Sequence, residues 1–122
     1  MNTVAQIFVA LAGVLHLVFF AMESLLFRKP SVQQRFRVKT EAEAEAARPW
    51  AFNQGFYNLF LAAGAIGGLI AGGDRGYAIA LFSCACMLGA GLVLIGSDRR
   101  MAQSAAIQAG PPLIGLVLAA VL

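Results

Sequence analysis

Four long apolar stretches alternate with short polar ones along this chain, over residues 4–27, 50–71, 77–95 and 101–122. Each is close to the roughly 20 residues that an α-helix needs to cross a hydrocarbon core about 30 Å thick. A membrane span of this kind must be helical, because every backbone N–H and C=O has to be satisfied within the segment. The pattern therefore predicts an all-α integral membrane four-helix bundle, with one domain over residues 1–122.

The two short connections indicate which spans are neighbours. They read GGDRG at 72–76 and GSDRR at 96–100, and their glycines favour tight turns. Helices joined by so short a loop pack side by side and run in opposite directions. We therefore expect antiparallel packing of spans two and three, and of spans three and four.

The first connection, over residues 28–49, is longer and basic. Its EAEAEAA stretch is a strong helix former, and Thr40 with Glu43 three residues later fits a capping box. Pro49 suits the first turn of a helix or a kink. The sequence predicts a short interfacial helix at about 41–47, after which the chain turns into span two.

The composition excludes a soluble bundle. Only 12% of the residues are charged and 60% are hydrophobic, so too few charges remain to cover four outer helix faces. Eight of the nine Lys and Arg residues lie in the first connection or at Arg99 and Arg100, against one, Arg75, in the second connection. The positive-inside rule then places both termini on the non-cytoplasmic side. We attribute the net charge of +3 to the placement of the chain in a membrane. The expected partner is therefore the lipid bilayer, and no nucleic acid is expected.

Polar side chains inside the spans are the candidates for function. Span one has His16 and Glu23, which lie close to two helical turns apart and so share a face. Span two opens with four polar side chains on one broad face: Asn53, Gln54, Tyr57 and Asn58. Span four has Gln108 ahead of Pro111 and Pro112. Such groups rarely face lipid, so we expect these side chains to meet in a polar cavity in the cytoplasmic half of the bundle.

Each candidate also has a purely structural interpretation. A single buried histidine such as His16 often has its hydrogen bonds satisfied within the protein core and binds no ligand. Glu23 can reach toward Arg28 or Lys29 among the lipid headgroups. The amides can join neighbouring helices by hydrogen bonds, and Tyr57 can anchor its helix at the membrane surface.

The cysteines predict no metal site or cofactor. Cys84 and Cys86 are two residues apart in span three, so on a helix they point to nearly opposite sides and cannot bond to each other. We interpret them as small packing residues. One His and one Glu two turns apart make a poor ligand set, so no metal and no cofactor are expected.

These residues resemble those of a family of small bacterial four-helix integral membrane proteins, catalogued as a domain of unknown function. The likeness is carried by His16 and Glu23, by NQGFYN at 53–58 followed by LFLAAG, and by Gln108 before the prolines. It covers nearly the full chain. The resemblance implies a four-span fold with these polar residues as its signature, and it implies no substrate or reaction. With the charge bias, it favours a multi-pass protein of the bacterial inner membrane.

Three functions stay open at this point. The preferred one is a polar intramembrane cavity that binds a small amphiphilic ligand or a proton beside Glu23 and is linked to transport, because a carboxyl group in low-dielectric surroundings can exchange a proton for a ligand. The first alternative is an intramembrane acid–base enzyme of the isomerase, hydratase or hydrolase type that acts on a lipophilic substrate. The second is a structural membrane subunit, including a homo-oligomer, whose polar groups set the register of its helices.

Overall fold

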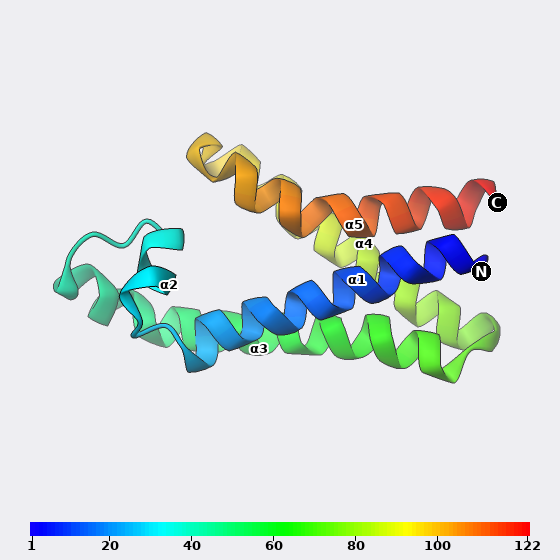
Figure 1. Cartoon of the computed structure of the whole chain (residues 1–122), viewed down its shortest axis with the longest axis horizontal. Coiled ribbons are helices and arrows are strands. Elements are labelled where there is room, and N and C mark those ends of the chain that lie inside the picture. The colour runs from blue at the N-terminus through cyan, green and yellow to red at the C-terminus, as the bar shows by residue number, and fades with distance from the viewer. The chain divides into compact units, whose positions relative to one another are not determined.

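The computed structural model describes residues 1–122, and its regular elements are all helical. In chain order these elements are α1 (Thr3–Phe20), the π-helical turn η1 (Ala21–Leu25), α2 (Pro30–Arg35), α3 (Glu41–Ala71), α4 (Gly73–Ser97), the 3-10 turn η2 (Arg99–Met101) and α5 (Ala102–Val121) (Figure 1). Four segments are long and apolar enough to cross a membrane, namely Thr3–Leu25, Glu41–Ala71, Gly73–Ser97 and Arg99–Val121. The predicted all-α fold with four membrane-spanning helices is therefore confirmed, whereas the orientation of the termini and the bacterial inner membrane stay predictions.

The chain divides into two compact units. The terminal unit comprises residues 1–16 and 61–122, and the loop unit comprises residues 17–60. Helices α1 and α3 are each divided between the two units, so that one part of each helix belongs to the terminal unit and the other part to the loop unit.

Small side chains build the core of the terminal unit. The cluster at its centre consists of six buried residues: Val9, Ala12, Ala65, Ala80, Cys84 and Met87. Helices in lipid gain little from the hydrophobic effect when they associate, so close van der Waals packing of small residues has to hold them together. Both cysteines are free, and Cys84 lies within this core.

Helices α3 and α4 approach each other until their backbones touch. A Cβ atom added at Gly68 would lie 2.7 Å from the backbone nitrogen of Ala80, and one added at Gly76 would lie 2.5 Å from the carbonyl oxygen of Gly68. Gly72 and Gly73 join the two helices with φ of +66° and +65°, a left-handed conformation that only glycine adopts without strain. The tight turn and the antiparallel packing predicted for these two spans are therefore confirmed.

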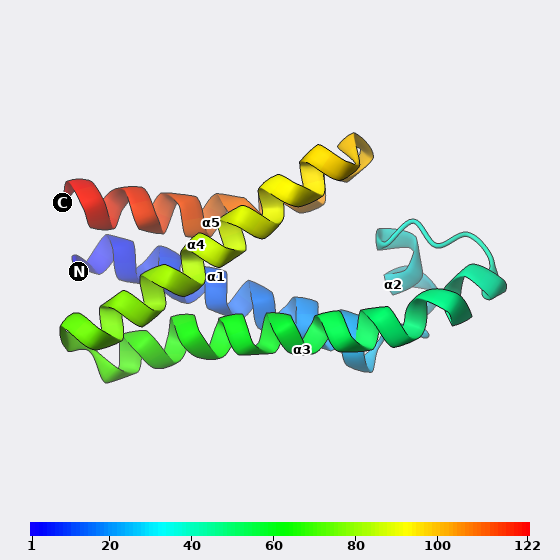
Figure 2. The ribbon, with the colours of Figure 1, turned by 180° about the vertical axis from the view of Figure 1, so that it is seen from behind.

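Helix α5 runs antiparallel to α4 and to the first part of α1. A Cβ atom at Gly91 of α4 would lie 2.7 Å from that of Ala109 in α5, so this pair also depends on small residues. At the other side of α5, the side-chain amide of Asn2 donates a hydrogen bond of 2.9 Å to the carbonyl oxygen of Leu118. The two ends of the chain consequently lie side by side, as Figures 1 and 2 show from opposite directions.

Helix α3 begins nine residues earlier than the predicted second span. Its start is capped as the sequence predicted, because the Thr40 hydroxyl accepts a hydrogen bond of 3.1 Å from the Glu43 N–H. The Glu43 carboxylate accepts from the N–H of Lys39, one residue before the position that a standard capping box uses. The short helix expected at 41–47 is thus the first part of α3, which continues through Pro49. One proline removes a single backbone hydrogen bond, and the Ala- and Glu-rich turns before it favour the helix strongly enough to maintain it.

We expect Gly68→Ala to lower the free energy of unfolding by about 1–3 kcal/mol, because the new methyl group would meet backbone atoms of α4 that cannot move aside. Gly67→Ala is the matched control, because a Cβ atom there meets nothing within 4 Å. We expect the control to be neutral or to stabilise by up to about 1 kcal/mol. Unfolding in mixed micelles by increasing SDS, followed by circular dichroism, measures both. Equal effects of the two substitutions would contradict the close packing of α3 on α4.

Candidate functional site

Glu23, in η1, is the only acidic side chain that the structure buries, with 8% of its surface exposed. The side-chain amide of Asn58 in α3 donates a hydrogen bond to its Oε1 atom. Asn58 is itself only 4% exposed. Two polar groups from separate segments of the loop unit thus satisfy each other away from the surface, as buried polar groups must.

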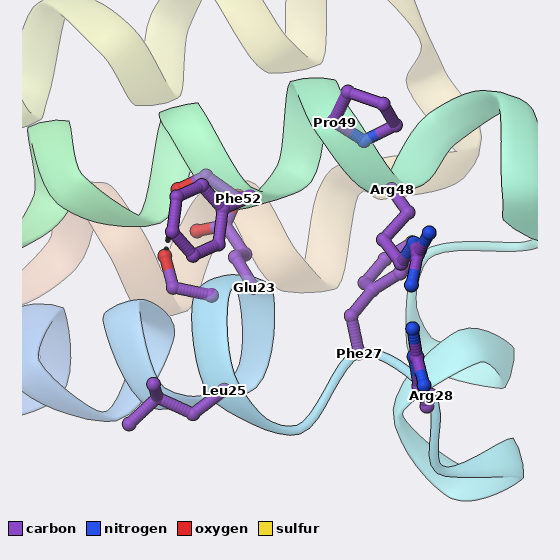
Figure 3. Close-up of a pocket in the computed structure, with 8 residues that line it drawn as sticks. Glu23, Leu25, Phe27, Arg28, Arg48, Pro49 and Phe52 are labelled. Atoms are coloured by element: carbon purple, nitrogen blue, oxygen red, sulfur yellow. Dashed lines mark hydrogen bonds between the residues drawn. The ribbon is translucent and has the colours of Figure 1, made fainter.

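The π-helical turn η1 positions Glu23. Its Leu26 N–H donates to the Ala21 carbonyl oxygen at 2.8 Å, a spacing of five residues instead of the four of an α-helix. Such turns are frequent at functional sites. The next side chain, Ser24, donates a hydrogen bond of 2.7 Å to the carbonyl oxygen of Phe52 in α3, drawn as a dashed line in Figure 3. Two consecutive side chains of η1 are therefore hydrogen-bonded to α3.

Gly55 allows η1 to approach α3 this closely. A Cβ atom at this position would overlap the hydroxyl oxygen of Ser24 and lie 3.0 Å from its backbone nitrogen. The neighbouring Phe56 packs edge-on against Phe20, with ring centroids 5.2 Å apart, and lies 5.1 Å from the ring of Phe52. The glycine of the NQGFYN motif thus has a defined role, and aromatic rings pack beside the turn that it accommodates.

Within the loop unit, the structure brings Glu23 and Asn58 together but not the other predicted polar residues of α3. Asn53, Gln54 and Tyr57 are exposed. At about 100° of rotation per residue, positions 55 and 58 share the face toward η1, whereas positions 53 and 57 point roughly away from it. The single broad polar face expected from the sequence therefore divides into a buried part at Asn58 and an exposed part.

The two remaining candidates, His16 and Gln108, belong to the terminal unit. His16 is fully buried, and its Nδ1 atom donates a hydrogen bond of 2.8 Å to the carbonyl oxygen of Ala12 one turn earlier in α1. Gln108, in α5, is half-buried. A meeting of all seven predicted residues in one cavity stays a prediction.

A pocket of about 450 Å³ opens beside Glu23 in the loop unit (Figure 3). Its walls combine one carboxyl group, one hydroxyl group and two guanidinium groups with apolar side chains, contributed by Glu23, Ser24, Leu25, Phe27, Arg28, Arg48, Pro49 and Phe52. Sequence reasoning assigned no site role to Ser24, Arg28 or Arg48. The sequence does distinguish the two arginines, because they are the first and last basic residues of the connection. Arg28 directly follows span one, and Arg48 lies two residues before span two.

Metal-binding side chains do not gather in this chain. No group of three or more His, Cys, Asp or Glu residues lies close enough together to hold a metal ion. The polar groups at the candidate site include Glu23, its amide partner Asn58, the hydroxyl group of Ser24 and the two arginines of the pocket.

Comparison with known proteins identifies a family. The profile of a family described as "Protein of unknown function (DUF1304)" matches residues 10–120. No curated protein and no solved structure matches the chain. The matched range contains all seven residues singled out from the sequence, so the predicted membership of a four-helix family of unknown function is confirmed.

We expect Asn58→Ala to lower the free energy of unfolding by about 1–3 kcal/mol, because it leaves the buried Glu23 carboxyl group without its donor. Asn53→Ala removes the same amide from an exposed position of the same helix and should change stability by less than about 0.5 kcal/mol. SDS-induced unfolding of both variants measures the difference. A similar loss in the two variants would show that Asn58 has no special role at Glu23.

Proposed function

The chain belongs to the DUF1304 family, whose description gives no function, and we propose from its own residues that it binds a small amphiphilic molecule in the pocket beside Glu23 and exchanges a proton at that carboxyl group. The observation that supports this proposal is a buried acid on the wall of an open pocket. Ionisable groups at membrane depth are costly, and they commonly mark pathways for ligands or protons.

The size and lining of the pocket favour an amphiphile. Its volume of about 450 Å³ lies within the roughly 300–1,000 Å³ typical of small-molecule sites. Phe27, Pro49 and Phe52 offer apolar walls, while Arg28, Arg48 and Glu23 offer charged groups. A ligand with both a polar head and an apolar body matches this division better than a purely hydrophobic or purely polar one.

Proton exchange follows from the position of Glu23. A charge placed within about 4–6 Å of a carboxyl group changes its affinity for a proton. A cationic ligand in the pocket would therefore release a proton from Glu23, whereas an anionic ligand would cause proton uptake. Coupling of this kind provides a basis for a role linked to transport, in which the proton and the ligand compete or travel together.

A panel of amphiphiles that share a dodecyl chain and differ in head-group charge tests this proposal. With the protein in a neutral detergent, we expect one charge class to raise the melting temperature and to change the number of bound protons in weakly buffered solution. Glu23→Gln keeps an oxygen that can accept from Asn58, so it should fold but lose the proton exchange. Asn53→Ala, altered at an exposed position, should retain both responses.

The other outcomes would either contradict the proposal or favour one of the two alternative functions. Absence of stabilisation by any charge class, or unchanged proton exchange in Glu23→Gln, would contradict the proposal. Conversion of an added lipophilic compound would favour the acid–base enzyme instead. Unfolding or dissociation of Glu23→Gln without any response to ligand would favour the structural subunit.

A further inference from the structure

We propose that the end of the pocket formed by Arg28 and Arg48 binds the oxyanion head group of an amphiphile, a phosphate or a carboxylate. The inference rests on the proposed pocket and specifies the chemistry of its occupant. It assigns a binding role to two basic residues of a kind that commonly sets the orientation of a membrane protein.

Arg28 and Arg48 reach this end of the pocket from different segments. Arg28 follows η1 in the turn before α2, and Arg48 belongs to the first part of α3. Figure 3 shows their guanidinium groups pointing toward one another, on the side of the pocket away from the Glu23 carboxyl group. Arg28 is exposed and the Arg48 side chain is 38% exposed, so an anion that enters the pocket can reach both guanidinium groups. Each carries five N–H donors on a planar fork that matches the oxygens of a phosphate or carboxylate.

Of the carboxylates of the loop unit, one, Glu45, forms a salt bridge with this pair. Arg48 contacts Glu45 at 3.4 Å, in a salt bridge whose carboxylate side chain is 63% exposed. Exposed pairs of this kind contribute little. Arg28 takes part in neither of the two salt bridges of the structure, and the Glu23 carboxyl group accepts from Asn58. An oxyanion in the pocket would supply an acceptor for Arg28, which takes part in no salt bridge, and could replace the exposed Glu45 at Arg48.

The apolar walls suit a hydrocarbon chain attached to that head group. Phe27 is 5% exposed and packs on Phe36, with ring centroids 5.7 Å apart, while Pro49 and Phe52 line the pocket from α3. The charged side chains that line the pocket with Glu23 are the two arginines alone. A bound anion would therefore bring a negative charge into a pocket that Glu23 also lines.

Two sources share this ligand chemistry. One is the phosphate of a membrane phospholipid head group, and the other is a free single-chain anion such as a fatty acid or an alkyl phosphate. Dodecyl phosphate titrated into the protein in dodecyl maltoside probes the free anion. Native mass spectrometry of phospholipid retained through detergent extraction probes the head group. If binding occurs in either experiment and is lost when Arg28 or Arg48 is replaced, the site is supported. The experiment that shows such binding identifies the ligand as a free anion or a phospholipid head group.

The decisive comparison uses four single substitutions in the same connection. Arg28→Gln and Arg48→Gln should each weaken dodecyl phosphate binding, or phospholipid retention, on the order of tenfold, because charge-assisted hydrogen bonds are lost. Lys29→Gln and Arg35→Gln remove the same charge outside the pocket lining and should change binding by less than about twofold. Circular dichroism establishes that each variant is folded.

Four results would overturn the inference. Equal weakening by all four substitutions would show general attraction to a basic connection. Stabilisation by a cationic or neutral amphiphile alone would contradict the oxyanion site and leave the proposed pocket function intact, whereas no binding by any amphiphile would contradict both. If Arg28→Gln does not fold, Arg28→Lys replaces it, because lysine keeps the charge but lacks the planar fork. Unchanged affinity in Arg28→Lys would then contradict the proposed geometry.

Discussion

A carboxyl group inside an apolar pair of helical segments must have a polar partner, and in this chain Asn58 provides it for Glu23. Leaving either group buried alone would cost about 1–3 kcal/mol or more. The pair therefore contributes to how η1 faces α3. The hydrogen bond from Ser24 to the Phe52 carbonyl joins the same two segments, and the missing side chain at Gly55 leaves room for their close approach.

The same contact explains why the candidate site has mixed chemistry. It holds an acid on one wall of a pocket whose other polar groups are the guanidinium groups of Arg28 and Arg48 and the hydroxyl group of Ser24. Opposite charges of this kind do not neutralise one another here, because Glu23 accepts from an amide and not from an arginine. The pocket therefore has cationic groups at one end and the acid Glu23 on its other side, and this division is the physical basis of the proposed binding of an amphiphile.

The sequence predicted the fold better than the site, for physical reasons. Four apolar stretches and two glycine-rich turns determine four spans and their antiparallel order, because the length of a span and the geometry of a short turn are local properties. The pairing of Glu23 with Asn58 was contained in the predicted cluster. The exposure of Asn53 and Tyr57 was not predictable, because it depends on which face of α3 meets η1. That face is set by the π-helical turn and by Gly55, neither of which alters hydropathy.

A double-mutant cycle between Glu23→Ala and Asn58→Ala measures how strongly the buried carboxyl group and its amide partner depend on each other. Free energies of unfolding in mixed micelles would be measured for the original protein, the two single variants and the double variant. If the carboxyl group and the amide depend on each other, the double variant should lose less stability than the sum of the single ones, with a coupling energy of about 0.5–3 kcal/mol. Losses that add to within about 0.3 kcal/mol would show that the two side chains do not interact, and would contradict the account of the site.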